Sequence, residues 1–375
     1  MNRCLSFTIL IAMLAIVSPA FATNPELTSE GLEQRIDFWK KIYTQYGKDD
    51  IVIHDVLRVN LIYDVATDDD YPEKMLATQA TLREIRAGLD TPEAFSPEAK
   101  LIADAIVAQG ISLNTAELDA LIGNIHTQRG IKEQFRDGIV RSGRHVDSFR
   151  EILRRSGVPE ELALLPLVES SFENVRSKAG AVGVWQFTRG TGKLYLTITN
   201  KVDERLDPTK AASAAARLLR DNYNALQDWP LAITAYNHGR GGMLRAQSEY
   251  GSDLVAIIND YRGPVFGYAS MNFYSEFLAA VDVYNNYTNY FGELVLDQPN
   301  TPRTVQVAAA APKAAPKAAP TKTAKATAAE KKYKVQRGDT LWQVAQRFGT
   351  TIRSLMEVNN LNESAIYAGQ ILLVK

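Results

Sequence analysis

The feature that most limits how this chain can fold is an abrupt change of composition over residues 299–331. Its stretch "APKAAPKAAPTKTAKATAAEKK" contains almost no large apolar side chain, so it cannot bury a core of its own. Its prolines and like-charged lysines favour an extended chain instead. We therefore expect a flexible linker between a long preceding region and a small carboxyl-terminal unit.

The first residues have the features of an export signal. Arg3 precedes an apolar core over residues 5–17, and the small-x-small sequence "AFA" follows it. Because that core is too short to span a bilayer, we expect a signal peptide over 1–22, cleaved after Ala22; the alternative is an uncleaved anchor. Cys4 is the only cysteine and precedes the core, so it cannot be a lipoprotein acylation site. The expectation is an exported protein of the periplasm or cell envelope, with no transmembrane segment in the mature chain.

Charge and histidine placement argue against two kinds of partner. The formal net charge is −1 and no long basic stripe is present, which disfavours nucleic acid. His54, His126 and His145 are scattered without the spacing of metal ligands, and the mature chain would contain no cysteine to help bind zinc. We therefore expect no metal and no cofactor.

Residues from about 27 to 300 are predicted to be mostly helical. The segment "TSEGLEQRIDFWKKIYTQY" places its apolar residues at helical spacing, and several amphipathic segments follow it. Residues 51–65, "IVIHDVLRVNLIYDV", alternate and are rich in β-branched side chains, so they are the one candidate strand pair before the carboxyl terminus.

One acidic side chain, Glu169, stands directly after an apolar run in "LALLPLVESSFENVRSKAGAVGVWQFT". A carboxylic acid with few polar neighbours keeps its proton to higher pH, as a general acid requires. Pro159 with Glu160 and Glu161 favours a helix start, and Pro166 is expected to kink that helix just ahead of Glu169. The alternative is that Glu169 ends a buried helix and simply points to water.

Two further segments contain residues suited to ligand binding. In "AGAVGVWQFTRGTG" small residues let the backbone approach a ligand closely before Trp185 and Gln186. In "LAITAYNHGRGG" Tyr236 and Asn237 precede a glycine-rich turn. Each segment alone is also explained by a helix end, a tight turn or a core aromatic residue.

Together, in this order and at these distances, the three segments resemble the Slt-type lytic transglycosylases, which have a goose-type-lysozyme-like helical fold. The matching motifs are "E-S", "G-x-W-Q" and "A-Y-N-x-G", here Glu169-Ser170, 183–186 and 235–239. The resemblance covers about residues 158–290. It implies a mainly α, lysozyme-like catalytic domain over 150–298, preceded by a mostly helical region over 23–149.

The resemblance implies that Glu169 is the only catalytic carboxylate and acts on peptidoglycan at the MurNAc–GlcNAc β-1,4 bond. The N-acetyl group and the 6-hydroxyl of the sugar would supply what a second carboxylate otherwise supplies, and the product would be 1,6-anhydro-MurNAc. Ser170 is expected to orient Glu169 or the N-acetyl group. Gln186, Tyr236 and Asn237 are expected to hydrogen-bond the sugars.

Several other side chains have roles that the resemblance does not settle. Glu173 is expected to be a solvated surface acid, and Asp203 and Asp207 are available acids outside the motifs. His238 fills the variable position of "A-Y-N-x-G" and is expected to be a spectator. The family's later cleft tyrosine aligns with Phe273; its neighbour Tyr274 either reaches the substrate or is a packing aromatic. These alternatives stay open at this point.

The last segment, residues 332–375, resembles the LysM module, a small βααβ carbohydrate-binding fold. It contains "Y-x-V-x-x-G-D-T-L-W", "FGTT", "L-x-x-x-N-x-L" and "I-x-x-G-Q-x-L-x-V". The resemblance implies binding of N-acetylglucosamine-containing glycans through Gly338, Asp339, Thr340 and Asn360. Core positions of the unit are expected at Leu341, Trp342, Ile352 and Leu355.

The leading hypothesis is an exported lytic transglycosylase that a tethered LysM unit holds on peptidoglycan glycan strands. One alternative is a hydrolytic muramidase of the goose-lysozyme kind. The other is a wall-binding scaffold without activity.

Overall fold

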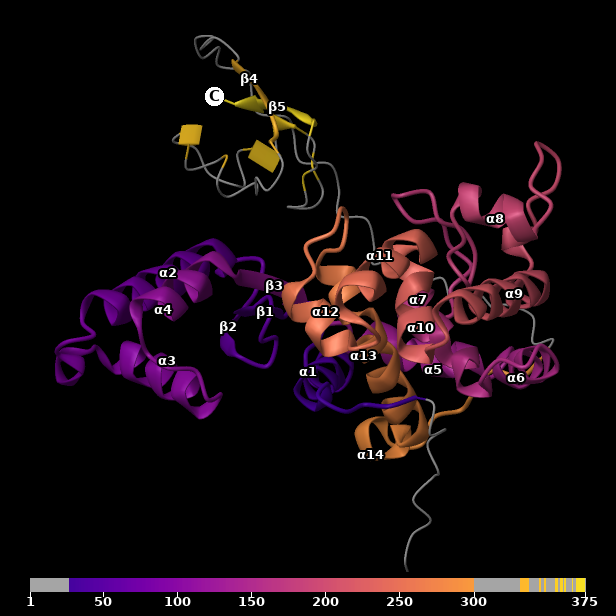
Figure 1. The fold of residues 1–375 in the computed structure, drawn as a ribbon, viewed down its shortest axis with the longest axis horizontal. Coiled ribbons are helices and arrows are strands. Elements are labelled where there is room, and N and C mark those ends of the chain that lie inside the picture. Colours follow the sequence, from indigo (N-terminus) through magenta and orange to yellow (C-terminus); the bar gives the residue numbers. More distant parts are fainter. Residues whose placement is uncertain are drawn as a thin grey trace, which may run out of the picture. The chain divides into compact units, whose positions relative to one another are not determined.

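The computed structural model describes two units of the chain. The first is described over residues 27–299, and the second over 331–336, 344, 347–348, 355–356, 358–359, 361, 366 and 369–374 (Figure 1). The expected signal peptide and almost all of the expected linker lie outside these residues, as do Gly338, Asp339, Thr340 and Asn360. Among the described helices, none combines the length and apolarity needed to cross a membrane.

The first unit is built mainly from helices, which confirms the predicted fold class. Its α-helices are α1 Glu33–Thr44, α2 Tyr71–Ala87, α3 Pro97–Ala108, α4 Thr115–Gly123, α5 Lys132–Ser142, α6 Val146–Arg155, α7 Leu165–Ser170, α8 Arg189–Tyr195, α9 Pro208–Leu226, α10 Trp229–His238, α11 Arg240–Tyr250, α12 Leu254–Asp260, α13 Tyr268–Asn285 and α14 Tyr287–Phe291. Short 3₁₀ helices span Pro92–Ala94, Glu160–Leu164 and Glu204–Leu206.

An antiparallel three-stranded sheet lies near the start of the unit, in the order β2-β1-β3. The predicted strand pair at 51–65 is confirmed as β1 Ile51–Asp55 and β2 Ile62–Ala66. The expectation of only one pair was wrong, because β3 Ile125–Arg129 adds a third strand to the unit. Its sequence, "IHTQR", shows no apolar alternation, so pairing with β1 rather than local preference makes it a strand.

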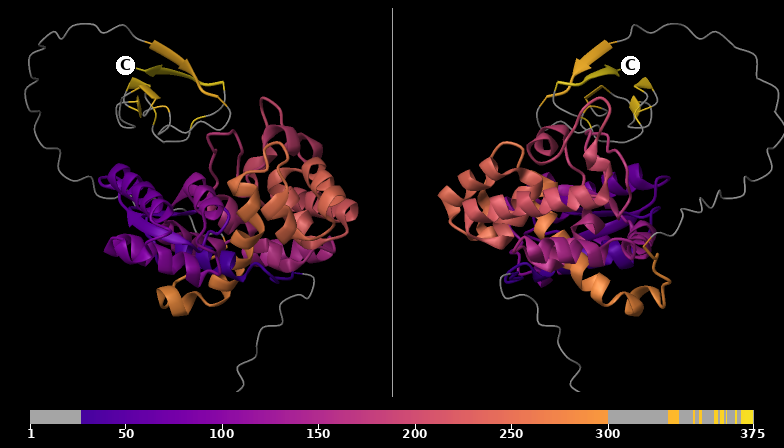
Figure 2. Two further views of the ribbon diagram at one scale, coloured as in Figure 1. Left: turned by 60° about the vertical axis from the view of Figure 1, so that its left-hand side comes forward. Right: turned by 90° about the vertical axis from the view of Figure 1, so that its right-hand side faces the viewer.

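The two largest hydrophobic cores of the first unit are formed by different sets of helices. Helices α1, α5 and α6 share a large core with α7, α9, α10 and α13, and α1 packs along α13. Helices α2–α4 enclose a second core around Leu82, Ile106 and Leu118. Figures 1 and 2 show α2–α4 as a lobe beside the main helical body. Part of the expected N-terminal region is therefore built into the same core as the candidate site.

Residues early in the chain fix the start of α13. Arg35 and Trp39 of α1 both donate to the side-chain oxygen of Asn272, over 2.8 and 3.2 Å. The Tyr268 hydroxyl lies 3.2 Å from Nε2 of His54, which is fully buried in β1. These contacts connect α1 and the sheet to the first turns of α13. They therefore help to position the part of the site that lies on α13.

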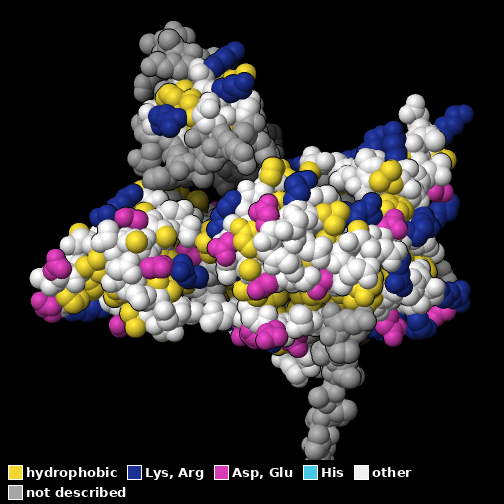
Figure 3. Space-filling model, viewed as in Figure 1, with side chains coloured by type: hydrophobic (Ala, Val, Ile, Leu, Met, Phe, Trp, Pro, Cys, Tyr) yellow, Lys and Arg dark blue, Asp and Glu magenta, His cyan; other side chains and the backbone are white. Residues whose placement is uncertain are grey.

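The lobe and the opposite end of the unit present different charges. Residues 67–123 of the lobe include eleven acidic residues and four basic ones. The lobe also exposes Leu76, Leu101 and Val107, and Figure 3 shows apolar side chains along it. On the same face, Lys and Arg side chains gather over the end that carries α8 and α9 (Figure 3).

The second unit contains two antiparallel strands, β4 Lys331–Lys334 and β5 Ile371–Val374. Val335, Leu355 and Leu372 are buried in its core, so the prediction of a core position at Leu355 is confirmed. The side chain of Asn359 bonds both the backbone nitrogen and the backbone oxygen of Leu373, over 2.6 and 2.9 Å. This amide ties the segment between the strands to β5.

Candidate active site

Glu169 lies at the end of a helix that is divided in two. A 3₁₀ turn over Glu160–Leu164 is followed by α7, which has Pro166 in its first turn, so Pro166 begins a new helix instead of kinking one as predicted. The helix stops at once after Ser170, because Ser171 and Phe172 both adopt left-handed backbone angles, with φ of 50° and 59°. Two such residues in succession are strained, and strain of this kind concentrates at functional sites.

The Glu169 carboxyl is half-buried and has no partner. Among the residues that the structure describes, none donates a hydrogen bond to it or forms an ion pair with it. Burial raises the pKa of Glu169 to about 8, since the charged form loses solvation without compensation. Glu169 therefore carries its proton at neutral pH and is suited to act as an acid.

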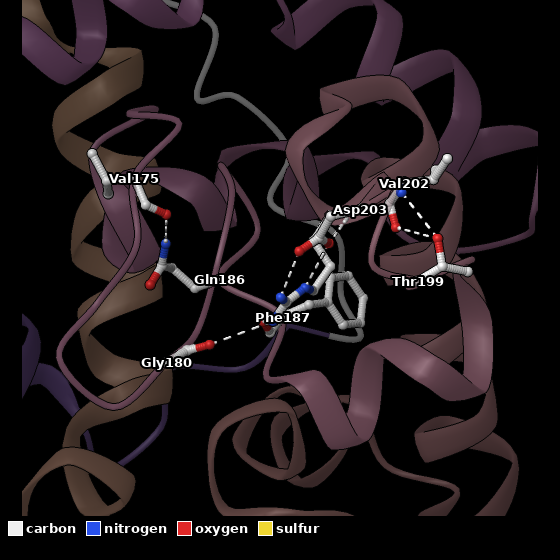
Figure 4. A network of polar contacts seen from close by, with 8 residues as sticks. Val175, Gly180, Gln186, Phe187, Thr199, Val202 and Asp203 are labelled. Atoms are coloured by element: carbon white, nitrogen blue, oxygen red, sulfur yellow. Dashed lines mark hydrogen bonds and ion pairs between the residues drawn. The ribbon is translucent and has the colours of Figure 1, made fainter.

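The loop over residues 180–187 is shaped by a buried arginine. Arg205 is 1% exposed; it donates to Phe187 O over 3.1 Å and holds both oxygens of Asp203 over 2.8 and 2.7 Å (Figure 4). Gly183 has a φ of 86°, and a Cβ there would lie 1.9 Å from Arg205 O. Only glycine fits this position of the "G-x-W-Q" motif.

Two predicted site residues hold this loop in place. Ser170 donates to Val184 O over 2.7 Å, which ties the end of α7 to the loop. Gln186, with a φ of 48°, donates to Gly183 O over 2.7 Å. It also donates to Val175 O over 3.2 Å (Figure 4). Both of these bonds use the amide nitrogen of Gln186, so its side-chain oxygen remains available to accept a hydrogen bond from a ligand.

The "A-Y-N" motif at the end of α10 contacts both the loop and α13. The Tyr236 hydroxyl donates to Trp185 O over 2.8 Å. Burial first and the charge of Glu169 second raise the pKa of Tyr236 well above its usual value, so the two side chains are close enough to interact. Asn237 is exposed and accepts a hydrogen bond from Ser270 over 2.8 Å.

The Tyr274 side chain does not join Glu169, Gln186, Tyr236 and Asn237 in the candidate site. Its side chain is 1% exposed and its hydroxyl donates to Thr28 O over 2.9 Å, so of the two alternatives the packing aromatic fits the structure. Phe273 instead faces the site, with its ring parallel to that of Tyr236 at 6.4 Å between centroids. The aligned position of the motif thus reaches the site, but without a hydroxyl group.

His238 packs against two aromatic side chains. Its ring lies edge-on to Phe266 at 5.0 Å and to Tyr261 at 6.4 Å. A Cβ at Gly242 would lie 2.2 Å from its Nε2, so the glycine-rich turn makes room for the imidazole. These contacts are those of a packing residue.

The three other acids considered from the sequence have structural partners. Glu173 lies 3.3 Å from Nη2 of Arg141, and Asp203 is held by Arg205, which lowers the pKa of its carboxyl. Asp207 accepts from two backbone amides in the first turn of α9. None of the three is an unpaired acid like Glu169.

A fourth acid, which the sequence reasoning missed, interacts with Glu169. Glu276 lies on α13, the helix that packs against α7, and is half-buried. Burial first and the charge of Glu169 second raise the pKa of Glu276 to about 8. Its local signal is the same as that of Glu169, a lone acid in the apolar stretch "MNFYSEFLAA". The described residues contain no cluster of three or more His, Cys, Asp or Glu side chains that could hold a metal.

Comparison with known proteins identifies two domains. Residues 148–257 match the family "Transglycosylase SLT domain", and residues 333–375 match the family "LysM domain". A segment of 97 residues is 38% identical to "Membrane-bound lytic murein transglycosylase D" of Escherichia coli (strain K12), covering 25% of this chain and 22% of that protein. A segment of 101 residues is 37% identical to the "Putative tributyltin chloride resistance protein" of Alteromonas sp. (strain M-1), covering 26% and 48%.

These matches concern domains, since the chain spans less than half the length of either relative. A solved structure, that of an inactive mutant of lytic transglycosylase Slt from Pseudomonas aeruginosa, aligns with 60% of this chain and 34% of its own. Its sequence identity is 14% and its TM-score 0.33, too low to bear on the fold. Glu276 lies beyond the residues that match the SLT family. The chain thus contains a Transglycosylase SLT domain and a LysM domain after it, and about a quarter of it is similar in sequence to membrane-bound lytic murein transglycosylase D.

Proposed function

We propose that the chain is a peptidoglycan lytic transglycosylase that cleaves the MurNAc–GlcNAc β-1,4 bond without water, with Glu169 as its acid and base. One observation carries the proposal most directly: an unpaired, half-buried carboxyl stands where the "E-S" motif of the SLT domain lies, and it holds a proton at neutral pH. A general acid must hold its proton at the working pH.

In the first step Glu169 gives its proton to the glycosidic oxygen. The bond between that oxygen and C1 of MurNAc breaks, and GlcNAc leaves with a free 4-hydroxyl group. The N-acetyl carbonyl of MurNAc stabilises the electron-poor C1, as in other substrate-assisted glycosidases. Glu169 is now a carboxylate.

In the second step the Glu169 carboxylate removes the proton from the sugar's own 6-hydroxyl, and O6 bonds to C1. The product is a 1,6-anhydro ring, Glu169 regains its proton, and no water is consumed. Intramolecular attack suits this step, because a tethered hydroxyl reacts at a very high effective concentration.

The surrounding residues fit substrate binding and positioning. The Gln186 oxygen and the exposed Asn237 side chain are available to hydrogen-bond sugars. Tyr236, fixed by Trp185 O, supports the acid, and Ser170 acts through the loop it holds. Tyr274 has no part in the proposal, because its hydroxyl is bound to Thr28.

The LysM domain is proposed to bind glycan strands through Gly338, Asp339, Thr340 and Asn360. The linker expected over residues 299–331 would then raise the concentration of glycan near Glu169. Export to the periplasm or cell envelope belongs to the same proposal, because the substrate lies there.

The test compares Glu169→Gln with wild type and with Glu173→Gln, a nearby acid paired with Arg141. Purified peptidoglycan is digested and the released fragments are analysed by mass spectrometry. We expect 1,6-anhydro-MurNAc ends from wild type and Glu173→Gln, and a loss of about a thousandfold in rate for Glu169→Gln. Unchanged release by Glu169→Gln would remove Glu169 from the mechanism, and absence of release by wild type would favour an inactive scaffold.

A second candidate, a hydrolytic muramidase, is favoured by one observation. Glu276 places another carboxyl near Glu169, and glycosidases that use water generally use two carboxylates. Digestion in water labelled with oxygen-18 separates the two reactions. Lytic cleavage predicts unlabelled anhydro ends, whereas hydrolysis predicts reducing ends that carry the label.

A further inference from the structure

Two helices that are distant in the sequence bring Glu169 and Glu276 to the same site. Helix α13 packs against both α7 and α10. Phe273 and Glu276 are three residues apart on α13 and so share a face of that helix. The Phe273 ring lies parallel to that of Tyr236, the residue whose hydroxyl group is held by the loop carbonyl of Trp185. Glu276 therefore lies next to Phe273 on α13, within reach of the charge of Glu169.

Neither carboxyl has the partner that a buried acid normally has. None of the described residues donates a hydrogen bond to the Glu276 side chain or forms an ion pair with it, as for Glu169. Burying an acid without a partner is unfavourable, and two like acids side by side add to that penalty. Elsewhere in the same unit acids do have partners, such as Arg205 for Asp203 and Arg141 for Glu173. An unpaired acid pair that persists in such a fold indicates function.

We propose that Glu276 is a positioning residue for Glu169: the two carboxyls share a site across the contact between α7 and α13, and Glu276 keeps the proton on Glu169 until substrate takes it. This inference rests on the proposed function, in which Glu169 is the acid. It assigns no bond-making step to Glu276.

The physical basis is that two nearby carboxylates cannot both ionise without mutual repulsion. When Glu276 is ionised, loss of the Glu169 proton becomes less favourable, so a larger fraction of molecules stays active as the pH rises. When Glu276 is protonated, it faces the Glu169 carboxylate formed in the first step without repelling it. Both effects act on Glu169 and neither needs contact between Glu276 and the sugar.

The other titratable groups that interact with the pair do not change charge in the relevant range. They are Tyr236 of α10, Tyr43 of α1 and Tyr268 of α13, and burial raises the pKa of each well above its usual value. All three stay neutral between pH 5 and pH 9. A pH effect in this range therefore reports on the two glutamates.

The first experiment measures rate against pH from 5 to 9.5 on soluble peptidoglycan fragments for wild type, Glu276→Gln and Glu173→Gln. Glutamine has the shape of glutamate but never ionises. We expect the alkaline limb of the Glu276→Gln profile to move to lower pH by about one unit, because the repulsion that kept Glu169 protonated is gone. Glu173→Gln, which removes a charge from a paired surface acid, should leave the limb where it is in wild type.

Three outcomes decide the inference. A shifted alkaline limb, with a folded protein by circular dichroism, supports it. An unshifted limb overturns it, and so does complete loss of turnover at every pH in a folded Glu276→Gln variant, which would make Glu276 part of the chemistry. The proposed function is judged separately, by Glu169→Gln and by the anhydro ends of the wild-type product.

A second readout does not depend on turnover. The carboxyl carbon of Glu276 is followed by ¹³C NMR through a pH titration in wild type and in Glu169→Gln. If the two acids interact, Glu276 loses its proton at lower pH in Glu169→Gln than in wild type. Identical titrations would contradict the inference even if a glutamine variant at position 276 failed to fold.

Discussion

Two regions of the first unit shift the pKa of their carboxyl groups in opposite directions. In the segment after α8, Asp203 is held by the buried Arg205, and the pKa of its carboxyl is lowered. At the contact between α7 and α13, Glu169 and Glu276 have no partner and the pKa of each is raised to about 8. The fold pairs the acid that supports a loop, and leaves unpaired the two acids at the position where the proposed function requires a retained proton.

Neutralising one acid from each region should give opposite results. Glu169→Gln should lose about a thousandfold in rate and none of its thermal stability at neutral pH. Asp203→Asn should lose about 2–3 kcal/mol of unfolding free energy, because Arg205 is then buried without its counter-charge. Rates on peptidoglycan and urea unfolding measure the two effects. If Asp203→Asn kept full stability, or Glu169→Gln unfolded, the two regions would not differ as described.

The loop over residues 180–187 contains two glycines, Gly180 and Gly183, that have similar backbone angles but different surroundings. Gly183→Ala should cost at least about 2 kcal/mol, since it combines a positive φ with a Cβ that would lie 1.9 Å from Arg205 O. Gly180→Ala has a similar φ, 83°, but nothing within 4 Å of its Cβ, so about 1 kcal/mol is expected. Thermal melts of both variants provide the measurement. Equal losses would show that the contact with Arg205 O is unimportant.

The pH dependence of stability distinguishes the two regions with opposite signs. A carboxyl whose pKa is raised in the folded state keeps a proton that the unfolded chain releases above about pH 4.5, so its contribution to stability falls as pH rises toward 8. Glu276→Gln should therefore be more stable than wild type at pH 8, by about 1–2 kcal/mol after allowance for solvent screening, and equal to it near pH 4. Unfolding in urea at the two pH values checks this.

Asp203 should show the reverse dependence. Its lowered pKa means that stability is present above about pH 4 and is lost at lower pH, as the carboxyl is protonated. Asp203→Asn should thus differ most from wild type at neutral pH and least in acid. A difference that stayed constant between pH 3 and pH 7 would contradict the role given to this ion pair.

The smallest expected effect concerns two histidines of the sheet, His54 and His126, which lie near the start of α13. Burial lowers the pKa of His54 to about 3 and that of His126 to about 4, so both stay neutral at ordinary pH. Their ring resonances in NMR spectra should not shift between pH 5.5 and pH 8. A midpoint near 6.5 for either ring would show that this region is open to solvent.

Part of the site was predictable because its signals are local. Glu169 stands out within a few residues, as an acid after an apolar run with a proline just ahead of it. Gly183 is recognisable only as part of a run of small residues before Trp185, and its positive φ and close approach to Arg205 O appear in the structure alone. The mainly helical fold follows from the spacing of apolar residues, and the strand pair from the alternation over residues 51–65.

The rest depends on packing between distant segments. Glu276 meets Glu169 only because α13 lies against α7, with more than a hundred residues between them along the chain. The same packing turns Phe273 toward the site and Tyr274 toward Thr28, a choice that sequence spacing left open. Strand β3 forms through its pairing with β1. A single sequence carries no local signal for such contacts.

The proposed function and the role of Glu276 both require that the unpaired carboxyl of Glu169 hold its proton at neutral pH. The most direct test is ¹³C NMR of the Glu169 carboxyl carbon in the wild-type protein, titrated from pH 4 to pH 10 and assigned with Glu169→Gln. We expect a protonated carboxyl at pH 7 and a titration midpoint near 8. A midpoint near 4.5, the value of an ordinary solvated glutamate, would contradict this expectation.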